Sequence, residues 1–308
     1  MDKSRPCLIN LPKMVDPRGN LSFIESGDHV PFDVKRVYWI YDVPGGMYRT
    51  GHAFRRQSEM IVALSGSFDV VLDDGTGEQR HHLARSYYGL YVPPMTWRKI
   101  DNFSTGAVVM VLSNMRYDPS DYIEGHDEYL AELKTYRREP APDAPVATPD
   151  NVVPDGHATS DINDCEMLTL DRNQHPNGNL SVVEAGGQPL VMDDIRRVYY
   201  LYDVPAGEDR GGHSHRRLEQ FIVAISGSFD VTIDDGVARR TITLNRPFEG
   251  LYIRPGIWRV LNNFSGGAVA MVVASSHYDE GDYIRDYDDF LAATAEKRNI
   301  ITPNPEEK

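Results

Sequence analysis

The 308-residue chain has only two cysteines, Cys7 and Cys165, so no disulfide framework can hold it together. It also has fewer positive than negative side chains, because 32 Lys and Arg stand against 46 Asp and Glu, which gives a formal net charge of −14. So acidic a chain is poorly suited to binding nucleic acid or an anionic membrane surface. No apolar run approaches the roughly 20 residues of a membrane span. With a polar N-terminus that lacks the apolar core of a signal peptide, these absences predict a cytoplasmic protein.

What the sequence does contain is a long internal repeat. The segment VYWIYDVP at 37–44 returns as VYYLYDVP at 198–205, and later matching segments keep the same offset of 161 residues. An earlier pair, GNLS at 19–22 and 178–181, is offset by 159 residues, so the second copy gained two residues after this point. A period this long indicates a duplicated domain rather than a solenoid.

The repeat defines the expected domain organisation. We predict an N-terminal domain at 1–137, a linker at 138–164 and a C-terminal domain at 165–300. The linker is rich in proline and has little apolar periodicity, which favours a semi-extended connection.

Within each copy the residue pattern is that of β-structure. In the second copy, 221–225 is an apolar run typical of a buried strand, and 229–233 alternates apolar with polar residues. The Asp-Asp-Gly that follows at 234–236 predicts a hairpin. Helical periodicity is confined to 126–137 and 286–297. We therefore predict an all-β protein of two tandem jelly-roll β-barrel domains, each ending in a short helix.

The second copy carries a spaced set of polar residues that resembles the first metal-binding motif of the cupin superfamily: Gly207, His213, His215 and Glu219. Histidines two apart on a strand point to the same side. Where the motif's later partner histidine stands in cupins, this chain has Arg259, which does not ligate metal. A metal site would have to close with the two histidines and Glu219 alone. Proton transfer suits the pair better, since a pKa of about 6.5 serves acid and base roles; a satisfied polar pair at the barrel mouth is the structural alternative.

More extended motifs of the second copy resemble the dTDP-sugar 3,4-ketoisomerases, cupin enzymes that convert dTDP-4-keto-6-deoxyglucose to its 3-keto isomer. The segments that carry the resemblance are 197–203, 210–216, 227–228, 234–236, 250–253 and 278–285, together with Trp258. It extends over most of each copy. It implies a metal-free enediol mechanism without a cofactor, acting on a dTDP-linked keto-deoxysugar.

The resemblance also implies roles for individual residues. It places three side chains against the sugar as catalytic groups: His213, His215 and Tyr199. Guanidinium groups match the oxygens of a diphosphate or an enolate, so three arginines are candidates for substrate binding: Arg18, Arg210 and Arg259. A rim tyrosine is the alternative for Tyr199, and a solvated surface position is the alternative for Arg210 and Arg259.

The first copy departs from this pattern. It keeps Tyr38, Arg49 and His52, but Phe54 stands where the second histidine is expected and cannot move a proton. We therefore predict a degenerate site in the N-terminal domain. Its Glu59 aligns with a glutamine rather than with the motif glutamate, and a one-residue shift on a strand turns a side chain to the other face.

A second difference lies upstream. The first copy has Arg18 in the Asp-x-Arg-Gly pattern of the family, whereas the second copy has Asn177. The family is known for dimers that exchange N-terminal strands. If the two domains pair in this way as an intramolecular pseudo-dimer, Arg18 joins the two histidines of the second copy and Asn177 joins Phe54. One composite site per chain would then be complete.

Three other functions compete with the isomerase. A 3,5-epimerase of the same nucleotide sugar shares the Asp-x-Arg-Gly segment but has a lone catalytic histidine. A non-catalytic sugar-nucleotide-binding cupin would explain the degenerate first copy. A metal-dependent cupin oxygenase would require a bound metal.

Overall fold

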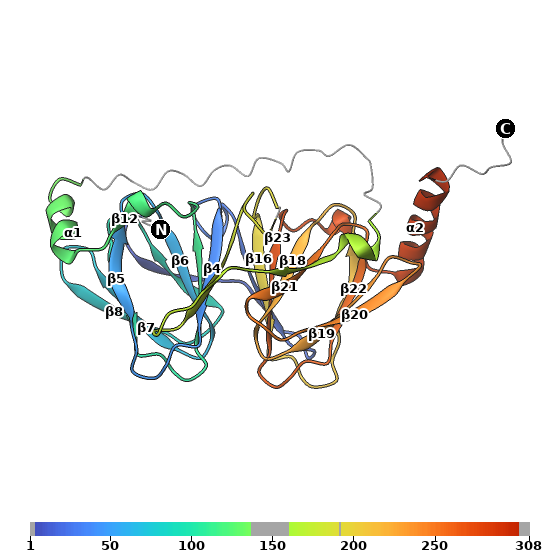
Figure 1. Ribbon diagram of the computed structural model, residues 1–308, viewed down its shortest axis with the longest axis horizontal. Helices are drawn as coiled ribbons and strands as arrows, with labels where there is room; N and C mark the ends of the chain where they lie inside the picture. Colours follow the sequence, from blue (N-terminus) through green and yellow to red (C-terminus); the bar gives the residue numbers. More distant parts are fainter. Residues whose placement is uncertain (1–3, 137–159, 191, 302–308) are drawn as a thin grey trace. The chain divides into compact units, whose positions relative to one another are not determined.

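The computed structural model describes residues 4–136, 160–190 and 192–301, and it is mostly β-sheet (Figure 1). The chain forms two compact units, each assembled from three stretches. Unit 1 comprises Met1–Lys13, Ser22–Thr148 and Leu170–Arg196; unit 2 comprises Met14–Leu21, Pro149–Thr169 and Arg197–Lys308. Each unit contains two antiparallel sheets, and the predicted all-β fold of two tandem jelly-roll domains is confirmed.

The predicted domain boundaries stay predictions. The expected linker, 138–164, lies for the most part outside the described residues, and its described end contains a short 3-10 helix, η2 (Ile162–Asp164).

Unit 1 has a seven-stranded sheet facing a five-stranded one. The order of the larger sheet is β1 (Cys7–Asn10), β9 (Tyr88–Val92), β6 (Glu59–Ser65), β11 (Val108–Ser113), β4 (Arg36–Tyr41), β15 (Asn179–Glu184) and β14 (Arg172–Asn173). The order of the smaller sheet is β12 (Tyr122–Ile123), β5 (Arg49–Phe54), β10 (Trp97–Asp101), β7 (Phe68–Asp73) and β8 (Glu78–Leu83). Apolar side chains from both sheets, among them Ile61 and Phe68, form the core between them.

Unit 2 repeats this arrangement. Its larger sheet contains, in order, β13 (Glu166–Thr169), β21 (Glu249–Ile253), β18 (Gln220–Ser226), β23 (Val269–Ala274) and β16 (Arg197–Tyr202). Its smaller sheet has the order β20 (Arg239–Leu244), β19 (Phe229–Asp234), β22 (Trp258–Asn262), β17 (Arg210–His215) and β24 (Tyr283–Ile284). Two further strands early in the chain are β2 (Lys13–Met14) and β3 (Asn20–Glu25).

Each unit contains a segment from the other repeat. Strand β15, from the second repeat, lies in the larger sheet of unit 1 and pairs antiparallel with β4, from Asn179 opposite Tyr41 to Glu184 opposite Arg36. The first-repeat segment Met14–Leu21 belongs to unit 2. The side chain of Asn20 in this segment donates to Asp203 at 3.0 Å, as that of Asn179 donates to Asp42 at 2.9 Å in unit 1.

The residue pattern explains the strands that carry the site. In β19 the side chains alternate as predicted, with Phe229, Val231 and Ile233 buried. The strand pairs with β20 across the predicted hairpin, where Gly236 has a φ of +84° that favours glycine.

Each unit ends in a helix, as predicted, but with different bounds. Helix α1 covers His126–Leu133, shorter than the predicted 126–137, and residues 134–136 leave it as a turn. Helix α2 covers Tyr287–Ile301 and runs longer than predicted. Buried aromatic side chains fix both helices, because Tyr129 packs beside Trp97, and Phe290 packs beside Trp258. In the part of the chain that the structure describes, no helix has the length and apolar character needed to span a membrane.

Candidate active site

In unit 2 the polar side chains of both sheets meet in the interior of the sandwich. Strand β17 contributes His213 and His215, which face the same side, as residues two apart on a strand must. Their ring centroids lie 5.0 Å apart with the planes at 88°. The ring of Tyr283 on β24 closes the cluster, 4.9 Å from that of His213 and 4.2 Å from that of His215.

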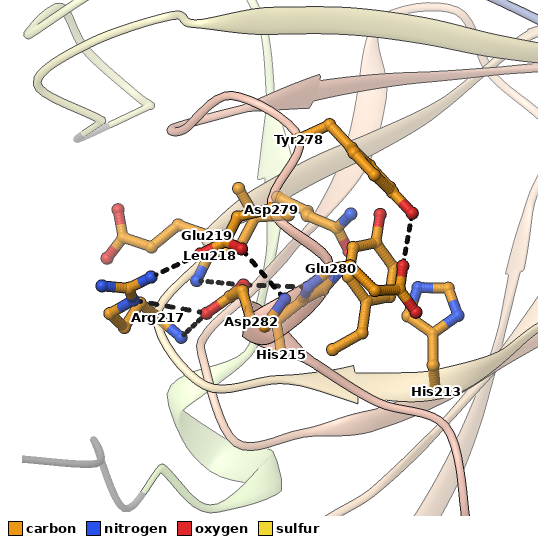
Figure 2. A network of polar contacts seen from close by, with 12 residues as sticks. His213, His215, Arg217, Leu218, Glu219, Tyr278, Asp279, Glu280 and Asp282 are labelled. Carbon is orange, nitrogen blue, oxygen red and sulfur yellow. Dashed lines mark hydrogen bonds and ion pairs between the residues drawn. The ribbon is translucent and has the colours of Figure 1, made fainter. Parts of the chain in front are cut away.

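A buried carboxylate orients the second histidine (Figure 2). Nδ1 of His215 lies 3.0 Å from Oδ2 of Asp282, and the backbone N–H of Arg217 donates to the same carboxyl group at 2.8 Å. Because a carboxylate only accepts hydrogen bonds, Nδ1 carries the proton and Nε2 keeps its lone pair. Nε2 is buried and has no hydrogen-bond partner among the described residues. It is therefore the atom of His215 that can exchange a proton with a ligand.

The larger sheet supplies a tyrosine, and the smaller sheet a buried arginine. Gln220 on β18 donates to the hydroxyl of Tyr199 on β16 at 2.7 Å. Arg259 on β22 is only 2 % exposed, so its surface alternative is wrong. It donates from NH1 to the carbonyl of His213 at 2.9 Å, while NH2 is buried without a partner in the described part of the chain. No carboxylate there lies within ion-pair distance of Arg259, so its charge has no direct partner and feels the Asp282 carboxylate only from farther away.

Burial and charge set the protonation states. Burial, reinforced by the charge of Arg259, lowers the pKa of His213 and holds that of His215 well below its usual value. Burial raises the pKa of Tyr199 although Arg259 opposes the shift. Burial also lowers the pKa of Arg259 to about 10. At neutral pH the site therefore holds two neutral imidazoles, a phenol and a guanidinium cation.

These shifts give a prediction for the pH dependence. A group whose pKa is lowered stays deprotonated to lower pH, so we expect kcat/KM for the free enzyme to stay level from pH 8 down to about 6. The measurement is a steady-state pH profile with the substrate proposed below. An acid limb centred near 6.5, the unperturbed histidine value, would show that the imidazoles are not desolvated.

The other two predicted arginines meet at the exchanged segment. Arg210 is partly buried, against the surface alternative, and donates to the carbonyl of Gly19 at 2.9 Å. Arg18 binds Asp16 through two side-chain nitrogens at 3.1 and 2.8 Å, and Asp16 also lies 3.7 Å from Arg210. The Arg18 side chain is 57 % exposed. Arg18, Arg210 and the two histidines all belong to unit 2, and their grouping in one site stays a prediction.

The metal alternative that used Glu219 finds no support in the geometry. The Glu219 carboxylate pairs with Arg254 at 2.8 Å, and Figure 2 shows it on the side away from His213. Among the described residues no group of three or more His, Cys, Asp or Glu side chains could hold a metal ion. The motif glutamate was the wrong residue to count, because the strand register turns Gln220 rather than Glu219 inward.

The equivalent site of unit 1 keeps only the first histidine of the pair on its strand, His52, although His175 also lines the cavity. The ring of Phe54 lies 5.0 Å from that of His52 at 85°, so it occupies the place that His215 has in unit 2. A cavity of about 470 Å³ adjoins His52, and its lining includes Tyr38, Arg49 and Asn177. Arg49 donates to the carbonyl of Gly178 at 3.0 Å, as Arg210 does to that of Gly19. Asn177 lines the same cavity as His52, and its pairing with the Phe54 site stays a prediction.

A buried ion pair fills the floor of this cavity. Nε of Arg98 binds Oε2 of Glu59, and its NH2 donates to Oε1 of Glu59 at 3.0 Å and to the Tyr38 hydroxyl at 2.8 Å. The Tyr38 hydroxyl donates to Glu59 at 2.7 Å. The side chains of Arg98 and Glu59 are 4 % and 1 % exposed. Burial, together with the charge of Arg98, lowers the pKa of His52 to about 3.

Five residues of the two sites were not predicted as site residues from the sequence: Gln220, Asp282, Tyr283, Arg98 and Glu59. A usable signal existed for three of them. Asp282 and its counterpart Asp121 recur at the repeat offset, and Gln220 is a polar residue that opens an otherwise apolar run. Arg98 follows from Arg259 by the same offset.

One protein-family model matches the chain twice, once in each repeat. The sequence profile of the family described as FdtA (WxcM-like, C-terminal) matches residues 4–134 and again 163–295. A curated relative from Aneurinibacillus thermoaerophilus, TDP-4-oxo-6-deoxy-alpha-D-glucose-3,4-oxoisomerase, is 49 % identical over 96 residues, which are 31 % of this chain and 69 % of the relative.

Two solved structures are each similar to less than half of this chain. A 3,4-ketoisomerase from Helicobacter canadensis is 39 % identical, with a TM-score of 0.42, over 43 % of this chain and 98 % of that one. A sugar 3,4-ketoisomerase from Thermoanaerobacterium thermosaccharolyticum, solved with TDP, is 34 % identical, with a TM-score of 0.42, over 42 % of this chain and 96 % of that one.

Proposed function

The chain belongs to the FdtA family (WxcM-like, C-terminal), and on that premise we propose that it is an isomerase converting a dTDP-linked 4-keto-6-deoxyhexose to its 3-keto isomer. The observation that carries the proposal is the pair of imidazoles of His213 and His215, 5.0 Å apart, beside the buried guanidinium of Arg259, which donates to the carbonyl of His213. The name of the curated relative supports the reaction type. A cytoplasmic location is part of the same proposal.

The geometry provides what an enediol mechanism needs. One histidine removes the C3 proton, and the electron pair forms a C3–C4 double bond while the C4 oxygen gains negative charge. The C4 oxygen takes up a proton to give the enediol, a second proton is delivered to C4, and loss of the C3 hydroxyl proton leaves the ketone at C3, so two protons leave and two are returned. Arg259 faces the developing oxygen charge and Tyr199 donates to it, an electrostatic stabilisation that a buried site strengthens.

We further propose that each chain has one complete site and that the two domains pair as an intramolecular pseudo-dimer with exchanged N-terminal strands. Support comes from β15, which lies in the sheet of unit 1, and from Met14–Leu21, which belongs to unit 2. Arg18 and Arg210 then hold the diphosphate. The site of unit 1, which includes Tyr38, Arg49, His52 and Phe54, is catalytically degenerate.

The Arg18→Ala change tests the composite site. An exposed arginine that binds a diphosphate contributes a charge-assisted hydrogen bond, so its loss is expected to raise KM roughly 10- to 100-fold. The matched control is Asn177→Ala, which removes the counterpart in unit 1 and is expected to change kcat/KM less than twofold. Steady-state kinetics measure both. Unchanged kinetics in Arg18→Ala would count against a composite site.

Turnover in deuterated water tests the reaction itself. The protein is incubated with dTDP-4-keto-6-deoxyglucose and the sugar carbons are followed by NMR. Isomerisation moves the ketone to C3 and incorporates deuterium at C4. A 3,5-epimerase would leave the ketone at C4 and exchange C3 and C5, a sugar-nucleotide-binding protein would change nothing, and an oxygenase would consume oxygen; each of these results would overturn the proposal.

A further inference from the structure

The two sites differ at one buried position that lies behind the reacting groups. Gln220 in unit 2 and Glu59 in unit 1 occupy the same place, 161 residues apart, at the start of β18 and β6. Their strand registers agree, since Gln220 lies opposite Ile253 and Ala274, and Glu59 lies opposite Val92 and Ser113. Both side chains are 1 % exposed.

In unit 1 the glutamate forms an ion pair with the neighbouring arginine. The carboxylate of Glu59 takes two hydrogen bonds from Arg98 and one from Tyr38. The charge of Arg98 is thereby neutralised inside the protein, and the hydroxyl hydrogen of Tyr38 is committed to Glu59. Neither group is left to stabilise a negative oxygen on a ligand.

In unit 2 the glutamine leaves both groups available. Its amide donates to the Tyr199 hydroxyl at 2.7 Å, so that oxygen accepts and its own hydrogen is free to point elsewhere. Arg259 has the same register as Arg98, because Arg259 lies opposite His213 and Arg98 opposite His52. Lacking a carboxylate partner among the described residues, Arg259 keeps its full charge and one unpartnered NH2 group.

We propose that Gln220 is a positioning residue. Its neutral amide leaves Arg259 without an ion-pair partner and leaves the Tyr199 hydroxyl able to donate a hydrogen bond to the ligand. A glutamate at this position inactivates the site whether or not the second histidine is present. The inference rests on the proposed isomerase function. It makes Glu59 a cause of the inactivity of unit 1 that is separate from Phe54 and Asn177. A carboxylate here both pairs with the arginine and repels the enolate oxygen that the arginine would stabilise.

The first test is Gln220→Glu, which builds the ion pair of unit 1 into unit 2. We expect kcat to fall about 10²–10³-fold, the loss typical of removing an oxyanion-stabilising donor. KM should change less than threefold, because the diphosphate contacts of Arg18 and Arg210 are untouched. Such a kcat-specific loss distinguishes positioning from damage to the fold.

Two further variants at this place separate charge from packing. Gln220→Met keeps the volume and adds no charge, so it is expected to retain at least a tenth of the wild-type kcat. Glu219→Gln removes a carboxylate one residue away, on the face that pairs with Arg254, and is expected to leave kcat unchanged. Gln220→Glu with wild-type kcat, or Gln220→Met as impaired as Gln220→Glu, would overturn the inference.

The second test restores unit 1 and holds even if Gln220→Glu fails to fold. In a chain whose unit 2 is silenced by His213→Asn, the pair Phe54→His and Asn177→Arg supplies the missing histidine and arginine. We expect no turnover from this chain until Glu59→Gln is added, and measurable turnover afterwards. Turnover without Glu59→Gln, or none with it, would contradict the inference. Inactive wild-type protein would instead remove the proposed function, and the inference with it.

Discussion

The His213→Asn variant is expected to lower kcat by about 10²–10⁴-fold, the usual contribution of a general acid or base. Asparagine keeps a polar side chain beside Tyr283 but exchanges no proton near neutral pH. The imidazole that is lost packs 5.0 Å from that of His215 and 4.9 Å from the ring of Tyr283. The measurement is single-turnover and steady-state kinetics, together with dTDP binding to confirm that the site still forms.

The control for this variant is His52→Asn, the same change at the equivalent place in unit 1. His52 has Phe54 rather than a second histidine beside it and a neutralised arginine behind it, so we expect turnover to change less than twofold. A His52→Asn variant that loses half of the activity would show that both units turn over. Retention of more than a tenth of kcat in His213→Asn would remove that histidine from the chemistry.

Much of the fold could be predicted because the sequence patterns that specify it recur at regular spacings. The repeat offset defines two equal sandwiches, and the alternation in 229–233 gives the buried face of β19 directly. The offset also transfers positions, so the amino-acid sequence alone is enough to match Tyr199, His213 and Arg259 to Tyr38, His52 and Arg98.

The less predictable part concerns which of two neighbouring residues faces inward. Glu219 and Gln220 are adjacent, and the motif spacing pointed to the carboxylate. On a strand, a shift of one residue in register moves every side chain to the opposite face, so it decides which of the two residues points into the site. The structure turns Gln220 to Tyr199 and Glu219 to Arg254. Strand pairing with β21 and β23, which is set by residues distant in sequence, decides this register.

The same substitution of the buried arginine by methionine is expected to lower the stability of unit 1 and the catalytic rate of unit 2. Arg98→Met leaves Glu59 as a buried and unpaired charge, which typically costs about 3–5 kcal/mol of stability. Arg259→Met removes a buried charge with no carboxylate partner in the described residues, so we expect a change in stability below about 1 kcal/mol. Its kcat should instead fall about 10²–10³-fold.

The pH dependence of Arg98→Met has a definite sign. Burial alone raises the pKa of Glu59, but in the wild type the pairing with Arg98 outweighs it and the pKa is lowered. The ion pair therefore stabilises the protein above the unfolded-state pKa of the carboxyl group and less as the pH falls through its folded value. Without Arg98 the pKa rises, so the stability difference from the wild type should be largest at pH 8 and should shrink towards pH 5.

Denaturant unfolding, with hydrogen exchange resolved to peptides of β6 and β10, measures this stability in unit 1. The double variant Glu59→Gln with Arg98→Met removes both charges and is expected to recover most of the lost stability, because a buried pair is replaced rather than broken. An Arg98→Met variant as stable as the wild type at pH 8 would mean that Glu59 is not held as a buried ion. Recovered stability in the double variant would show that the ion pair of unit 1 is not needed for folding. It would then follow that pairing with Glu59 makes Arg98 unavailable to a ligand without being required for stability.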